Sequence, residues 1–200
     1  MPMERQYLSR RSVLKTGIAI GFGLVPALAG VSGIATAAAN ESSGGVTRMG
    51  ALISALRSIG NPVCLVSASR LAALDPNITS FDLHLRSAGL DAEDARILAD
   101  ALRETNEFSG PGLRSFSASY NPALTDAGVV ALAEAFPTTM AELGLVGCSI
   151  GDEGGLAILS WARTAVGTRM ICVEANNFSA DMKTGFIQLS RERSSLLVVV

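Results

Sequence analysis

Two consecutive stretches of the chain, 113–136 and 140–162, carry the same order of residue types. In each, apolar residues at alternate positions are followed by small and polar residues, with an Asp two places before a Gly, and then by apolar residues at helical spacing. This order predicts a strand, a turn and a helix in each stretch. One short strand and one helix cannot bury their own apolar faces, so several copies must stack together.

Two further copies flank this pair. The upstream stretch 78–102 and the downstream stretch 170–189 show the same predicted order of strand, turn and helix. The intervals between equivalent turn residues are 34, 26 and 28 residues, and those residues are Leu90, Leu124, Ile150 and Phe178. The long first interval contains the polar stretch 105–112 with Gly and Pro, which we interpret as a loop insertion.

Within these copies a longer motif is visible. From Met140 to Ile158 the chain shows apolar residues in the order Leu-x-x-Leu-x-Leu, then a Cys three residues later, an aliphatic residue, an Asp and a Gly. Residues 113–132 fit with one extra residue after Asn121, and in the last copy Asn177 lies one residue early. This motif resembles the leucine-rich repeat of the ribonuclease-inhibitor type over residues 78–190. The resemblance implies an α/β fold, a short leucine-rich-repeat solenoid with a curved parallel sheet and helices on the convex side.

The small and polar residues of these copies have structural explanations. Asn121 and Cys148 lie where predicted strands end, where an inward Asn bonds unpaired backbone groups and a Cys fills the same buried slot. We expect the turn residues to cap the helices that follow them, these residues being Thr125 or Asp126, and Asp152. We expect two glycines to allow close approach of helix to strand, namely Gly128 and Gly154.

Residues 1–39 have the organisation of an export signal. A basic region at 5–15 precedes an uncharged run rich in Gly, Ala and Val, which ends in small residues typical of a cleavage site. The paired arginines resemble the twin-arginine export signal of bacteria, and the residues that carry this resemblance are Arg10, Arg11, Leu14 and Lys15. The signal implies transient membrane contact and a periplasmic or secreted protein. The alternative is an uncleaved membrane anchor, which also places the globular part outside the cytoplasm and which Pro26 disfavours.

The remaining segments extend the repeats at both ends. Residues 40–47 are interpreted as a linker, and residues 48–77 as a capping helix followed by a degenerate repeat with a short strand at 62–66. Four repeats occupy 78–190. For residues 191–200 three interpretations stay open: the last strand of a cap, a contact between two copies, or the start of a missing repeat.

Charge argues against one class of partner. The formal net charge of the chain is −2, and residues 1–39 hold four basic residues against one acidic residue, which leaves about −5 for the rest. A mildly acidic surface is poorly suited to a phosphate backbone. We therefore expect no nucleic-acid partner.

The residue types needed for catalysis are sparse. His84 is the only histidine and lies in a predicted strand, facing outward. The three cysteines, Cys64, Cys148 and Cys172, are widely spaced without a metal-ligand pattern, and we expect burial for the last two, with one disulfide such as Cys64–Cys172 as an alternative. Acidic residues at the starts of the predicted helices are explained by the helix dipole rather than by calcium. We expect neither enzymatic activity nor a cofactor.

The predicted concave sheet face is the candidate site. Residues at alternate strand positions face outward there, and the candidate partner-binding residues are Asp82, His84, Ser115, Ser117, Ser119, Glu142 and Glu174. They are small or acidic, with few aromatic or Arg anchors, so we expect weak or transient binding of an unknown protein partner. One alternative is a homo-oligomer of the envelope joined through Leu196–Val200. Another is an envelope enzyme with a site in the 105–112 insertion.

Overall fold

The structure is a computed structural model that describes residues 49–107 and 111–200. The predicted linker 40–47, the centre of the predicted insertion and the export motif lie outside the described residues, the motif being Arg10, Arg11, Leu14 and Lys15. The described residues form four helices that each follow a strand, with two further helices before the first strand and one strand after the last helix.

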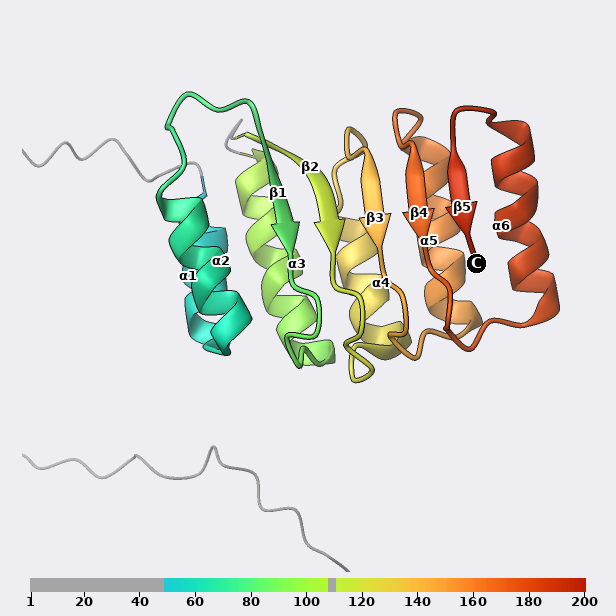
Figure 1. Ribbon diagram of the computed structural model, residues 1–200, viewed down its shortest axis with the longest axis horizontal. Coiled ribbons are helices and arrows are strands. Elements are labelled where there is room, and N and C mark those ends of the chain that lie inside the picture. The colour runs from blue at the N-terminus through green and yellow to red at the C-terminus, as the bar shows by residue number, and fades with distance from the viewer. Residues whose placement is uncertain (1–48, 108–110) are drawn as a thin grey trace, which may run out of the picture. The chain divides into compact units, whose positions relative to one another are not determined.

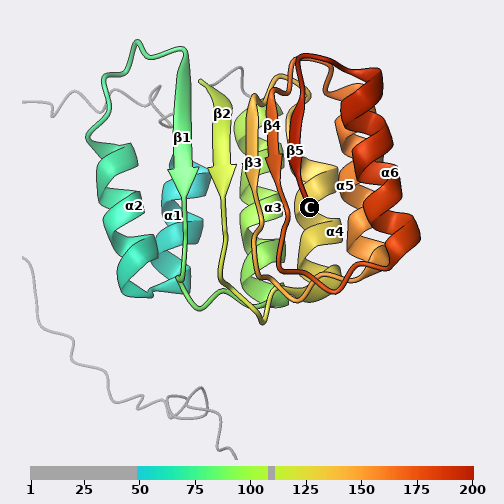
Figure 2. The same cartoon turned by 45° about the vertical axis from the view of Figure 1, so that its right-hand side comes forward.

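The strands are β1 (Ser80–His84), β2 (Gly112–Ser117), β3 (Glu142–Gly144), β4 (Met170–Cys172) and β5 (Leu197–Val199). The helices are α1 (Gly50–Ile59), α2 (Pro62–Ala72), α3 (Ala92–Glu107), α4 (Thr125–Ala135), α5 (Asp152–Thr164) and α6 (Ala180–Glu192). In the described part of the chain the strands pair in parallel in the order β1-β2-β3-β4-β5. Helices α3 to α6 lie against one face of this sheet, as both views show (Figure 1, Figure 2). The predicted fold class is therefore confirmed.

The core lies between the sheet and these helices. One row of inward residues crosses all five strands in register, and it consists of Leu83, Phe116, Leu143, Ile171 and Val198. The predicted repeat register is confirmed, because each of the four turn residues is buried: Leu90, Leu124, Ile150 and Phe178. Phe136 joins neighbouring repeats, since its ring centroid lies 4.9 Å from that of Phe116 and 5.7 Å from that of Trp161.

Asparagine side chains connect the strand exits, as the sequence predicts for Asn121. Asn121 donates to the carbonyl oxygens of Leu85 and Ala118 and accepts from the nitrogen of Leu90. In the next repeat Cys148 is buried with its sulfur 3.2 Å from the Ala118 oxygen, which confirms its predicted place. In the last repeat the position belongs to Asn176 rather than Asn177, because Asn176 accepts from the nitrogens of Cys148 and Ile150.

The strand expected at 62–66 is wrong, because these residues form the first part of α2. Asn61 caps this helix by accepting from the nitrogen of Cys64 at 2.9 Å, and Pro62 stands in its first turn. Proline there costs no hydrogen bond and favours helical backbone. A short apolar run fits a strand or a buried helix equally well, so its periodicity did not separate the two. Helix α1 contacts both α2 and α3. No helix of the described residues is long and apolar enough to cross a membrane.

Two predictions about the turns are also wrong. Helix α4 begins after Leu124 without a side-chain cap, so neither Thr125 nor Asp126 caps it. Asp126 Oδ1 instead accepts from the nitrogens of Gly151 and Gly154, at the start of α5 in the next repeat. Asp152 likewise accepts from the nitrogen of Ser179, ahead of α6. Gly128 and Gly154 allow neighbouring helices to approach each other, rather than a helix to approach a strand. A Cβ on Gly128 would lie only 3.0 Å from the Cβ of Ala95 on α3, which is too close for a larger residue without a shift.

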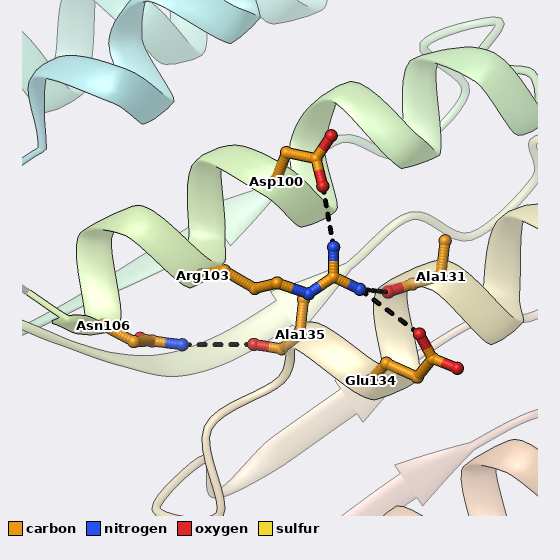
Figure 3. Close-up of polar contacts among 6 residues, drawn as sticks. All are labelled: Asp100, Arg103, Asn106, Ala131, Glu134 and Ala135. Atoms are coloured by element: carbon orange, nitrogen blue, oxygen red, sulfur yellow. Dashed lines mark hydrogen bonds and ion pairs between the residues drawn. The ribbon is translucent and has the colours of Figure 1, made fainter.

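Polar contacts on the helical side join α3 to α4 (Figure 3). Arg103 donates to Asp100 on its own helix at 2.7 Å, and to Glu134 at 3.3 Å and the Ala131 oxygen at 3.4 Å on α4. Asn106 donates to the Ala135 oxygen at 3.1 Å. These contacts fix the two helices that support β1 and β2.

Candidate functional site

The face of the sheet opposite the helices carries the candidate residues, and none of the described helices covers it (Figure 1, Figure 2). Register places its side chains in two rows across the strands. The first row is Asp82, Ser115, Glu142, Met170 and Leu197, and the second is His84, Ser117, Gly144, Cys172 and Val199. We call these two rows, with Ser119 and Glu174 beyond the strand ends, the open face. Five of the seven predicted residues lie in the two rows, and Ser119 and Glu174 continue the alternation beyond β2 and β4.

The serines of the open face are used internally. Ser115 and Ser119 are only 5% and 3% exposed. The Oγ of Ser115 lies 3.2 Å from His84 Nε2, and the Oγ of Ser119 accepts from the nitrogen of Val146 at 3.2 Å. These two predicted residues therefore offer little surface to a partner.

The contact between Ser115 and His84 has the spacing of a nucleophile and a base. Ser115 is buried, however, and the strand backbone around it is paired in the parallel sheet. Among the described residues, no third group is placed to orient the other ring nitrogen of His84. The pair can hold the imidazole in place on the open face.

Charges on the open face are unevenly distributed. Near β1 and β2, Asp82 forms an ion pair with Arg114, which is the extra residue where the register of β2 shifts against β1. Near β3 and β4, Glu142 and Glu174 flank Cys172. Partial burial raises the pKa of the Cys172 thiol above its usual 9.0, and Glu174 and then Glu142 raise it further. The carboxylates of β3 and β4 thus form an acidic region.

The β5 end of the face is apolar. Leu197 and Val199 are 57% and 38% exposed, and Met170 is half-buried beside them. Cys172 is also half-buried rather than buried as predicted, whereas Cys148 is buried. All three cysteines are free thiols. No group of three or more His, Cys, Asp or Glu residues in the described ranges could hold a metal ion.

Two residues that the sequence did not single out lie at the edge of the face. The guanidinium carbon of Arg86, just after β1, stands 4.0 Å from the ring centroid of Tyr120, just after β2. Tyr120 is 45% exposed. The expectation of few aromatic or Arg anchors is therefore corrected at this end. Arg86 continues the alternation of Asp82 and His84 beyond β1, as Ser119 does beyond β2, so alternation is a signal that could have found it. Tyr120 directly follows Ser119 and carries no such signal.

Comparisons with known proteins address the fold. No family model and no curated protein matches the chain. Among solved structures, 28 chains are similar. One of them, titled Leiomodin-1 Actin-Binding Site 2, is 19% identical in sequence with a TM-score of 0.50, and the match covers 66% of this chain and 74% of that chain. At this identity the likeness shows the fold alone, which is a short solenoid of the leucine-rich-repeat type.

Proposed function

We propose that this protein is an exported protein-interaction module that binds a partner through its open face. The observation that carries the proposal is the one-sided arrangement of the described helices, which leaves the other face of a five-stranded sheet available. Stacked repeats present a broad, rigid surface of this kind, on which binding residues come from several repeats. Binding, rather than catalysis by His84, is the function we assign to this face.

The structural neighbour supports the class of function. Its title names an actin-binding site, so a fold of this type carries a protein-binding surface in that protein. A shared fold does not transfer the identity of a partner, and we infer none from it. The small, largely buried serines Ser115 and Ser119 and the acidic residues favour a weak or transient contact.

The binding test replaces two central residues of the open face by bulky ones. A double variant, Ser117→Arg with Glu142→Arg, is expected to lose a partner that the wild-type full chain captures from native envelope extract, as read by mass spectrometry. The matched control is Ser160→Arg with Glu153→Arg, two exposed positions on α5. Far-ultraviolet circular dichroism should be the same for all three proteins. Equal capture by both double variants would reject the open face as the binding surface.

Export is proposed from the sequence of residues 1–39. Arg10→Lys with Arg11→Lys is expected to retain the protein in the cytoplasm, as measured by cell fractionation, because the paired arginines are the core of the resemblance. A matched control is Arg5→Lys, which lies outside the pair. Unchanged distribution of the double variant would contradict the twin-arginine route.

Self-association is a second candidate, favoured by the exposed apolar residues of β5. This strand pairs with β4 on one side, and Leu197 and Val199 project from it. An apolar strand with a free edge can pair with a second copy. Leu197→Ser with Val199→Ser is expected to lower the mass measured by light scattering if copies join there. An unchanged mass would remove this candidate.

A further inference from the structure

The backbone adopts the left-handed conformation at the same place after four successive strands. The φ angles are 52° at Ser87, 62° at Tyr120, 61° at Gly147 and 57° at Ala175. The nitrogens of Ser87, Tyr120 and Gly147 each donate to a backbone oxygen of the next repeat, and the acceptors are Ser119, Val146 and Glu174. Each acceptor directly precedes the left-handed residue of that repeat, which confirms that the four positions are equivalent. The repeat requires this conformation, which glycine adopts freely and which is unfavourable for a residue with a Cβ. Tyr120 is the one aromatic residue among the four.

Burial does not account for a tyrosine at this strained position, since 45% of the residue remains exposed. Its ring nevertheless has neighbours on two sides. The guanidinium of Arg86 lies on it at 4.0 Å, and on the side of the next repeat a Cβ on Gly147 would lie 3.5 Å from Tyr120 Cδ1. A ring fixed before binding loses little entropy on binding, and Tyr and Arg dominate the energetics of protein interfaces.

Arg86 is available to a partner. Arg114, near the start of β2, is paired with Asp82. Arg86, by contrast, has no ion pair or hydrogen bond with another side chain in residues 49–107 and 111–200 beyond its contact with the Tyr120 ring. A free guanidinium binds a carboxylate through two parallel hydrogen bonds.

The opposite charge lies two to three strands away. Glu142 on β3 and Glu174 after β4 form no ion pair within the described parts of the chain, and Oε2 of Glu174 is buried with no hydrogen-bond partner there. The edge of the face near β1 is therefore positive, and the region near β3 and β4 is negative.

We propose that Arg86 and Tyr120 anchor an extended partner segment that runs across the strands, with its carboxylate on Arg86 and a cationic side chain at Glu142 and Glu174. This inference rests on the proposed function of the open face. Continuing the register beyond the strands puts Glu174 in the same row as Arg86, three strand spacings of about 4.8 Å away, which is about 14 Å. Glu142 lies two strands away and four residues back along the strand direction, which is about 16 Å. Extended chain advances about 3.3 Å per residue, which places the acidic and basic residues of the partner about four to five positions apart.

The test selects short random peptides displayed on phage against the immobilised full chain. Enriched peptides are expected to carry an acidic and a basic residue about four to five positions apart. Selection on Arg86→Gln should lose the preference for the acidic residue, and selection on Glu142→Gln with Glu174→Gln should lose the preference for the basic one. The matched control is Arg163→Gln, an exposed arginine on α5, which should leave both preferences intact.

A second measurement uses the best peptide from the wild-type selection. Tyr120→Gly removes the ring and relieves the backbone, so the variant is expected to fold and to bind this peptide about tenfold more weakly or worse. If Ser117→Arg abolishes peptide binding while Arg86→Gln and Tyr120→Gly leave affinity unchanged, the open face binds protein but this inference is overturned. If the wild type enriches no peptide over the Ser117→Arg variant, the inference and the proposed function both fail.

Discussion

Asp126 of one repeat caps the helix of the next repeat at Gly151, whose backbone nitrogen lies 2.7 Å from Asp126 Oδ1. The same oxygen accepts from the nitrogen of Gly154 at 2.9 Å. A helix start leaves several N–H groups without partners, and a carboxylate there also meets the positive end of the helix dipole. The Asp and the Gly that recur in the motif thus meet between repeats.

We expect Asp126→Ala to lower the free energy of unfolding by about 1–2 kcal/mol, the usual cost of removing a side chain that caps a helix. Urea unfolding followed by the fluorescence of Trp161, the only tryptophan, measures the change. Asp181→Ala is the control, because Asp181 also stands in the first turn of a helix but is exposed. Equal losses in the two variants would show that helix-dipole effects alone explain the role of Asp126.

Gly154 should couple energetically to Asp126. A Cβ at position 154 would lie 2.7 Å from Asp126 Oδ1 and 2.6 Å from Ile150 Cγ2. Gly154→Ala therefore displaces the capping carboxylate as well as crowding Ile150. In urea unfolding, Gly154→Ala with Asp126→Ala is expected to cost less than the two single changes together, with a difference of about 0.5 kcal/mol or more. Strict additivity would mean that the alanine does not disturb the cap.

Much of this fold follows from residue order. The spacing of Leu90, Leu124 and Ile150 sets the stacking register, because each turn needs one buried apolar residue between strand and helix. Helix α2 did not follow, since a short apolar run carries no decisive period. The partner of Asp126 did not follow either, because a cap that crosses repeats depends on how closely neighbouring helices pack.

The candidate site was predictable only in part. Alternation along the strands places Asp82, His84 and Glu142 on the outward side, and the structure agrees. Alternation says nothing about how deeply Ser115 is covered. Alternation reaches Arg86, two residues after His84, but not Tyr120, which directly follows Ser119 and adopts the left-handed conformation.

Arg193 is expected to be a main support of the C-terminal repeat. Its guanidinium donates to four backbone oxygens at the end of α5 and beyond, and these belong to Ala162, Ala165, Val166 and Thr168, at 2.6 to 3.1 Å. Arg193→Met should lower the free energy of unfolding by about 2–3 kcal/mol, because several buried carbonyls lose their donor. Arg193→Lys should recover only part of this, since an ammonium cannot reproduce the planar fork. The exposed Arg191 provides the control, and a similar loss in Arg191→Met would contradict the assignment.

Acid should weaken the junction between α5 and α6. Two hydrogen bonds from Ser179 lower the pKa of Asp152 below its usual 3.8 in the folded protein. The bond from the backbone N–H has the larger effect and the bond from the hydroxyl the smaller. A depressed pKa in the folded state adds stability that is fully present above about pH 4 and is lost as the pH falls through the folded value. Thermal midpoints measured from pH 2 to pH 5 should therefore fall less steeply for Asp152→Asn than for the wild type. Parallel curves would show that the carboxylate charge does not contribute.

The three thiols should react in an order set by burial. Burial raises the pKa of Cys64 and of Cys148, each of which is covered in the core, while Cys172 is half-buried on the open face. A thiol reacts as its thiolate, so a raised pKa and poor access both slow its reaction with a disulfide reagent.

In the folded full chain the thiol of Cys172 should react first. Glu174→Gln should speed this reaction, because Glu174 raises the pKa of Cys172 more than Glu142 does. Cys172→Ser should remove this fast phase and leave the slow reaction of the other two. A fast phase that survives Cys172→Ser would mean that the helical side opens and exposes Cys64 or Cys148.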